Sequence, residues 1–172
     1  MAFSIYDASA PVLVKTLTNM MAWLDKAQAG GADEKTIVEA KLADDMRPFT
    51  FQIQSTSDSA KNAVARLTGG TAPSMPDTET TYAELKARLQ KTIDYINSVP
   101  ASAYEGAAER PIELKFPNGM GYAFSGADYL TGFVLPNFFF HSGMAYALLR
   151  ANGVAVGKPD VLQHLGQPHT MG

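Results

Sequence analysis

Two polar residues with chemical potential stand four positions apart in an apolar run, Asn137-Phe-Phe-Phe-His141. In an α-helix this spacing places both side chains on one face. With a third ligand from a neighbouring helix such as Gln52, the pair would form a facial metal site, and imidazole suits Zn, Ni or Fe. The alternative is a core histidine that hydrogen-bonds a backbone carbonyl, Gln52 or Ser55. We favour this alternative, because neutral Asn and Gln amides are weaker transition-metal ligands than imidazole or carboxylate.

The remaining signatures of catalysis are absent from the sequence. It contains no Glu-x-x-His pair, His-Glu-x-x-His, P-loop, G-x-G-x-x-G or G-x-S-x-G motif. With no cysteine, disulfides, thiolate metal ligands and a cysteine nucleophile are excluded. His164 and His169 have no sequence partner that would suggest a metal site. Asp58 would supply a carboxylate ligand if its helix turned it toward His141.

Four amphipathic segments must position these residues. Apolar side chains recur at steps of three and four, the pattern of helices that face a bundle core. The four stripes are Leu13, Leu17, Met20, Leu24 and Ala27; Met46, Phe49, Ile53, Thr56, Ala60, Ala63 and Leu67; Tyr82, Leu85, Leu89, Ile93 and Ile96; and Leu130, Val134, Asn137, His141, Ala145 and Leu148. We therefore expect Asn137 and His141 in the core, with Gln52 bordering the inner face of the second helix.

Capping residues and turns delimit the helices. The first begins either at Ser4, with Pro11 as an internal kink, or at Ser9. Helix one ends at Gly30-Gly31. Asp45 and Pro48 mark the start of helix two, which ends at Gly69-Gly70, and Thr81, in a capping box with Glu84, opens helix three, which stops before Pro100. Ser125 with Asp128 caps helix four, which ends near Asn152-Gly153. On helix three, we expect Glu84 and Arg88 to pair on the solvent face.

Smaller elements connect the long helices. Residues 33–40 are expected to form a short helix. The period changes to two at Ile112, Leu114 and Phe116, and Asn118-Gly119 supplies a turn before a return strand at 122–124, which predicts a small β-hairpin between helices three and four. Pro159 is expected to open a last short helix through Leu165, and residues 166–172 to form a mobile tail. The predicted class is all-α: one four-helix-bundle domain over residues 1–172.

The composition of the chain limits the classes of binding partner that we expect. The 172 residues are 46% hydrophobic and 18% charged, with a net charge of −3. The absence of basic runs argues against nucleic acid, and the low charge favours a homodimer. Residues 129–149 carry no formal charge over a bilayer-spanning length, but their polar residues and Pro136 favour a buried helix over a membrane segment. The first residues lack the pattern of a secretory signal, so we expect a cytoplasmic protein.

The run Leu135 to Val154, LPNFFFHSGMAYALLRANGV, resembles the helix-four signature of the DinB/YfiT-like superfamily, His-x-x-x-His-Arg-Gly-Gln followed by Leu-Arg and Gly. His141, Gly143, Leu149-Arg150 and Gly153 match it. The segments PFTFQIQSTSDSAKNAVARL and GADYLTGFVLPNFFFH look like one bacterial branch of the superfamily, described only as a domain of unknown function. The resemblance extends over residues 1–166 and implies a bundle in up-down-down-up order.

Members of this superfamily that are enzymes are typically metal-dependent thiol transferases or isomerases, with one histidine from helix two and two from helix four on the metal. In this chain Asn137 stands at the first helix-four position, Ser142 replaces the Arg, Met144 replaces the Gln, and Gln52 is the nearest match to the helix-two histidine. Only His141 of the three ligands is kept. The resemblance therefore supports the fold more than the chemistry.

Three functions are compatible with this pattern. The first, which we favour, is a protein without a metal that binds a small molecule, or keeps a buried polar network, around Gln52, Ser55, Asn137 and His141. The second is a metal-dependent thiol transferase, with Zn or Ni on His141 assisted by Asn137 and by Gln52 or Asp58. The third is a dimeric structural or stress-related protein without catalysis.

Overall fold

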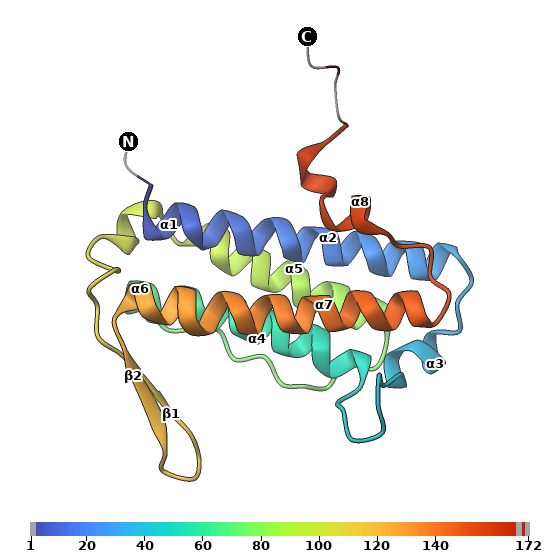
Figure 1. Ribbon diagram of the computed structural model, residues 1–172, viewed down its shortest axis with the longest axis horizontal. Coiled ribbons are helices and arrows are strands. Elements are labelled where there is room, and N and C mark those ends of the chain that lie inside the picture. The colour runs from blue at the N-terminus through green and yellow to red at the C-terminus, as the bar shows by residue number, and fades with distance from the viewer. Residues whose placement is uncertain (1–2, 168–169, 171–172) are drawn as a thin grey trace.

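Four long helices lie side by side in the computed structural model, which describes residues 3–167 and 170 (Figure 1). They are α2 (Ala10–Ala29), α4 (Phe49–Thr68), α5 (Tyr82–Ser98) and α7 (Leu135–Ala151). Helices α2 and α7 run in one direction and α4 and α5 in the other (Figure 1). The predicted four-helix bundle with its up-down-down-up order is confirmed.

The three-four stripes explain why these segments pack together. Every residue of the first three predicted stripes is buried except Met46, which precedes α4. Helix α4 packs against both α5 and α7, while α2 packs against α5. The buried apolar side chains form one contiguous cluster among the described residues. Removing this apolar area from water supplies the main driving force for the bundle.

Both predicted starts of the first helix are present. Ser4 caps a short helix, α1 (Ile5–Ala8), in a capping box with Asp7. At Ser9 the backbone leaves the helical region, with φ −122° and ψ −81°, and α2 begins at the next residue with Pro11 in its first turn. Proline is tolerated there because first-turn N–H groups have no helical partner. The two alternatives are therefore successive helices separated by one non-helical residue.

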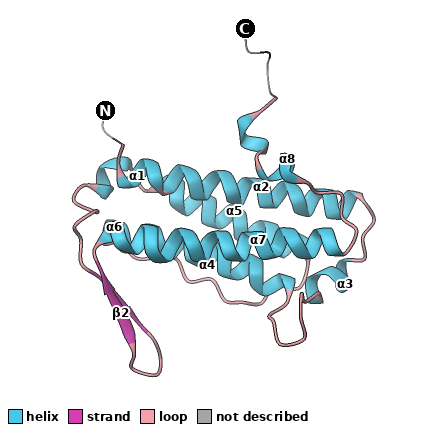
Figure 2. Ribbon diagram, viewed as in Figure 1, coloured by secondary structure: helices cyan, strands magenta, loops and turns pink. Residues whose placement is uncertain are grey.

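The smaller elements also follow the sequence. A short helix, α3 (Glu34–Glu39), is capped by Asp33. Strands β1 (Ile112–Lys115) and β2 (Gly121–Phe124) pair antiparallel with Leu114 opposite Tyr122, and the hairpin projects from one end of the bundle (Figure 2). The last short helix, predicted through Leu165, is instead two pieces: a helical turn, α8 (Lys158–Val161), and a 3₁₀ turn, Gln163–Leu165, which both lie along α2. Part of the predicted mobile tail, including His169, falls outside the described residues.

The fourth predicted helix is not uniform. Ser125 caps a turn, α6 (Gly126–Asp128), as expected, but residues Tyr129–Val134 are π-helical before α7 begins. The amide of Leu135 bonds the carbonyl of Leu130, five residues back. Pro136 follows directly, and a proline lacks an N–H and crowds the preceding turn, so a wider turn before it accommodates the ring.

This widened turn corrects the predicted inner face of the helix. The buried positions after Val134 are Phe138, Ser142, Ala145, Leu148 and Leu149, so the core spacing from Val134 begins with steps of four and four rather than the predicted three and four. Asn137 and His141 were expected in the core, but they are only half-buried. The extra residue per turn moves them around the helix, out of the packed core and toward its border with α4.

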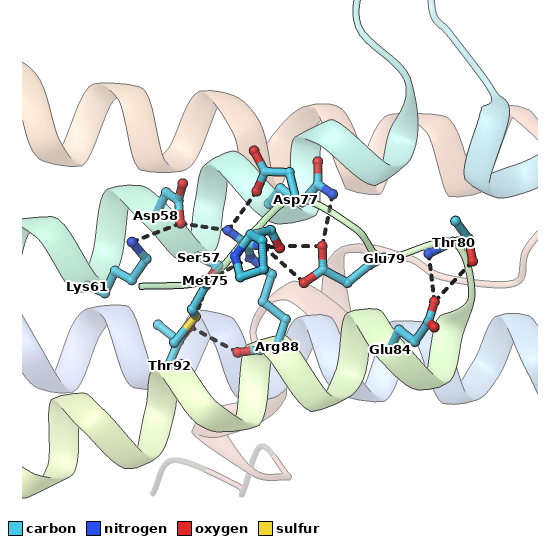
Figure 3. Close-up of polar contacts among 12 residues, drawn as sticks. Ser57, Asp58, Lys61, Met75, Asp77, Glu79, Thr80, Glu84, Arg88 and Thr92 are labelled. Atoms are coloured by element: carbon cyan, nitrogen blue, oxygen red, sulfur yellow. Dashed lines mark hydrogen bonds and ion pairs between the residues drawn. The ribbon is translucent and has the colours of Figure 1, made fainter. Parts of the chain in front are cut away.

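A long crossover links α4 to α5. Because these helices run in the same direction, residues 69–81 must return along the bundle, and an extended segment of that length covers the roughly 30 Å of a 20-residue helix. Arg88 of α5 pins this crossover (Figure 3). Its guanidinium donates to the Pro76 carbonyl at 3.1 Å and pairs with Asp77 and Glu79, each at 3.0 Å.

The prediction of an ion pair between Glu84 and Arg88 on the solvent face was wrong. The Arg88 side chain is only 1% exposed and also pairs with Asp58 of α4 at 2.7 Å, while Glu84 serves the cap of α5. Burial by itself would raise the pKa of Glu79, but hydrogen bonds from Gln54 and Arg88 lower it below its ordinary value. The sequence places Arg88 on the polar face of α5. It cannot show that Arg88 is buried, because the crossover covers a face of α5 that would otherwise meet solvent.

Within the described residues, the structure has no helix that combines the length and the apolar character needed to cross a membrane.

Candidate functional site

A polar groove of about 290 Å³ runs along the border between α4 and α7. Its walls come from these two helices, the π-helical segment, the hairpin and the crossover. The lining residues are Phe51, Ser55, Asp58, Ser59, Asn62, Arg66, Asp77, Leu114, Tyr129, Phe133, Asn137 and His141. Three of the four residues predicted for the site, Ser55, Asn137 and His141, therefore lie on one groove, and the fourth, Gln52, is buried at 3% exposure behind it.

Gln52 sets the orientation of the His141 ring. The Gln52 amide nitrogen donates to the Arg47 carbonyl at 3.0 Å, which leaves its oxygen toward His141. That oxygen lies 2.9 Å from Nδ1 of His141. An amide oxygen only accepts, so Nδ1 must carry the proton of the neutral ring and Nε2 keeps the lone pair. This leaves Nε2 of His141 as a hydrogen-bond acceptor.

The surroundings of His141 keep the ring uncharged. Burial lowers its pKa below the ordinary value of 6.5, since a desolvated imidazolium is disfavoured. Phe51 and Phe140 meet the ring edge to face, with centroids at 5.9 and 5.1 Å. At neutral pH, Nε2 is therefore a base and hydrogen-bond acceptor rather than a donor.

The other predicted site residues have separate partners. Asn137 donates its amide N–H to Ser59 at 3.3 Å, one turn of α7 away from His141. Ser55 lines the groove, but the hydrogen bond of His141 goes to Gln52. Asp58 also lines the groove, but its carboxylate pairs with Arg88 at 2.7 Å and with Lys61 at 3.2 Å.

This donor set does not fit a transition-metal site. His141 is the single imidazole on the groove. Both ends of the Gln52 amide are engaged in protein hydrogen bonds, and Asn137 turns its donor nitrogen to Ser59. Within the described part of the chain, no cluster of three or more His, Asp or Glu residues has a geometry that could hold a metal ion.

The sequence interpretation named Ser55 but missed the rest of a polar stripe on α4. Ser55, Ser59, Asn62 and Arg66 recur at helical spacing and line the groove together. Arg66 donates to the Tyr129 hydroxyl at 3.0 Å, and Tyr129 stacks on Phe133 with centroids 5.9 Å apart. The signal was present in the sequence as a polar stripe at steps of four, three and four next to the apolar one.

A comparison with known protein families identifies the family of this chain. Residues 5–162 match the family described as a domain of unknown function, DUF1993. The chain belongs to the DUF1993 family. This match covers nearly all of the bundle and confirms the resemblance to a branch described only as a domain of unknown function.

A solved structure supports the same relationship for this DUF1993 protein. The crystal structure of a DinB family member from Shewanella denitrificans has 34% sequence identity and a TM-score of 0.86, covering 98% of this chain and 96% of that one. The fold of the DUF1993 chain is thus DinB-like along its length. A comparison with curated proteins gave no match.

Proposed function

We propose that this protein binds a small polar molecule in the groove between α4 and α7 without a resident metal. The observation that carries the proposal is the fixed state of His141. Gln52 holds Nδ1 as the donor, burial keeps the ring neutral, and Nε2 is left as an acceptor at a groove. A ring held in one tautomer and orientation loses little freedom when it binds, which favours specific recognition.

The groove chemistry defines the ligand class. Nε2 of His141 would accept from a hydroxyl or amine of the ligand, and the hydroxyls of Ser55 and Ser59 both donate and accept. Farther along the groove, Arg66 presents a guanidinium and Phe133 an aromatic face. A small, flat molecule with a donor at one end and an acceptor or anionic group at the other fits this order.

The test is a thermal-shift screen with small thiols and aromatic acids. A ligand at a hundred times its Kd stabilises the native state by about 2.7 kcal/mol. His141→Ala should abolish the shift given by a groove ligand, whereas Gln90→Ala, on the exposed side of α5, should leave it unchanged. The proposal fails if no compound stabilises the protein, or if His141→Ala keeps the full shift of every compound that does.

A further inference from the structure

A second cavity of about 500 Å³ lies between α2, α7 and the C-terminal segment formed by residues 157–165. It shares no lining residue with the His141 groove, since α7 offers it Phe139, Ser142, Gly143 and Tyr146. The volume falls in the range of small-molecule sites, and the lining is mainly apolar and aromatic, as such sites usually are.

The outer wall of this cavity is held in place by polar contacts. The Asn19 amide nitrogen of α2, which is 4% exposed, donates to the Val161 carbonyl at 2.8 Å. The Trp23 indole donates to the Asp160 carbonyl at 3.1 Å, and Lys26 pairs with the Asp160 carboxylate at 2.6 Å. These contacts tie the C-terminal segment to α2, and the cavity lies between this segment and α7.

The floor of the cavity is a glycine. Apart from its chain neighbours and the backbone of its own helix, a Cβ built on Gly143 meets no atom within 4 Å, so this position in the middle of α7 opens onto free space. Trp23 and Tyr146 pack edge to face beside it, with centroids 5.9 Å apart. A glycine inside a helix costs about 1 kcal/mol relative to alanine. A side chain at 143 would fill space that an apolar ligand can use.

Two hydrogen-bond donors, the Lys15 ammonium and an N–H of His164, belong to residues that line this apolar cavity. Asn19 turns the same amide nitrogen to Nδ1 of His164 at 3.2 Å. An amide nitrogen only donates, so Nδ1 of His164 accepts this hydrogen bond and the ring N–H lies on Nε2. Lys15, which also lines the cavity, has no ion-pair partner among the residues described. In a chain of net charge −3, an ammonium and an imidazole N–H beside an apolar cavity complement an anion.

We propose that this cavity binds an amphipathic carboxylate, a molecule with an apolar chain or ring and one anionic end. The apolar body lies over Gly143 and against Trp23 and Tyr146, and the carboxylate meets Lys15 and Nε2–H of His164. The proposal is independent of the His141 groove, so its failure leaves the proposed function untouched.

Trp23 is the single tryptophan of the chain and lines the cavity, so its fluorescence reports occupancy directly. Titration with octanoate should change the emission of Trp23 saturably. Octanol, with the same apolar chain and no charge, should bind more weakly. Lys15→Gln should weaken octanoate binding about two- to fivefold, the range of an exposed ion pair, and leave octanol binding unchanged.

Gly143 offers a matched pair of variants. Gly143→Leu should weaken octanoate binding by about tenfold or more, since a leucine occupies the space of the alkyl chain, while Gly143→Ala should retain binding. Both variants should unfold at or above the temperature of the unmodified protein, because they replace a helical glycine. Saturable binding that survives Gly143→Leu, or equal affinities for octanoate and octanol, would overturn the proposal. A third outcome would also overturn it. If the emission of Trp23 does not respond to octanoate, and if the protein is a homodimer that Gly143→Leu dissociates, then the cavity holds a second copy of the chain.

Discussion

His141 takes its chemical character from one buried amide. The hydrogen bond from Nδ1 to Gln52, and the anchoring of Gln52 on the Arg47 carbonyl, leave one nitrogen of the ring for the groove. Asn137 and His141, the polar pair expected at i and i+4 on α7, therefore have different roles. Asn137 holds Ser59 across the groove, while His141 remains chemically available.

The tautomer of His141 is a first testable consequence. In long-range ¹H–¹⁵N NMR spectra, His141 should show the Nδ1–H tautomer and a pKa below 6.5. Since the unfolded chain then takes up its proton first, this residue lowers the stability of the fold as the pH falls from 6.5 toward the folded pKa.

Substitutions at Gln52 provide the controls for this assignment. Gln52→Glu should raise the pKa of His141 above 6.5, because a carboxylate stabilises the imidazolium. Gln52→Met removes the acceptor and should release the ring to the Nε2–H tautomer. An unmodified protein that already shows Nε2–H would contradict the assigned orientation of the amide.

A second prediction concerns metal binding at residue 137. Asn137→His places another imidazole one turn from His141 on the same groove and should raise zinc or nickel affinity about tenfold or more, as measured by titration calorimetry. Phe140→His is the matched control, since Phe140 is 53% exposed on another side of α7. Equal affinities for the two variants would mean that residue 137 does not face His141.

Among the elements, α4 contributes the most lining residues to the groove, and the crossover between α4 and α5 adds to its wall. Asp77 of the crossover forms part of the wall, and Arg88 holds Asp77, Glu79 and the Pro76 carbonyl against both helices (Figure 3). Ser57 and Thr92 share a further hydrogen bond of 2.7 Å beneath the guanidinium, and Ser57 also accepts from it. The groove therefore depends on a network centred outside it.

Breaking this network should be costly. Arg88→Met keeps much of the side-chain volume but leaves the partners of a buried ion pair without their cation, and we expect a loss of about 3 kcal/mol in the free energy of unfolding. Chemical denaturation measures it. Arg150→Met, on the exposed end of α7, should change stability by about 0.5 kcal/mol or less. Similar denaturation midpoints for both variants would show that Arg88 does not secure the crossover.

Glu79 of the crossover makes the stability of the fold depend on pH. Its pKa is lower in the fold than its ordinary value of 4.5, so its contribution is complete above pH 4.5 and is lost as the pH falls through the folded pKa. Unfolding followed from pH 7 to pH 3 should therefore show a smaller loss of stability for Glu79→Gln than for the unmodified protein. Parallel curves would exclude Glu79 as an acid-sensitive group.

For the whole molecule, the low charge fraction leads us to predict a homodimer. The hairpin is the candidate contact, because Met120 and Tyr122 are 68% and 59% exposed on an element that projects from the bundle (Figure 1). Light scattering should give about twice the 18.5 kDa chain mass, and Tyr122→Lys should shift the protein toward the monomer. A monomer at high micromolar concentration would remove the prediction.

The bundle itself was determined by local sequence. Stripes such as Leu13 to Ala27 and Tyr82 to Ile96, the caps Ser4, Thr81 and Ser125, and the Asn118-Gly119 turn act over a few residues. Such short-range preferences for apolar faces and capped ends can be interpreted without knowing which segments meet. The family resemblance on α7 added the order of the helices.

Only the tertiary structure decided which polar residues meet. Gln52 reaches His141 across 89 positions of sequence, and Arg88 is buried because a distant crossover folds over it. The π-helical turn before Pro136 shifted Asn137 and His141 from the expected core to the groove, which an ideal helical period cannot show. Pairing between distant side chains and the local phase of a helix depend on packing against the other elements, so they became visible only once the whole chain was folded.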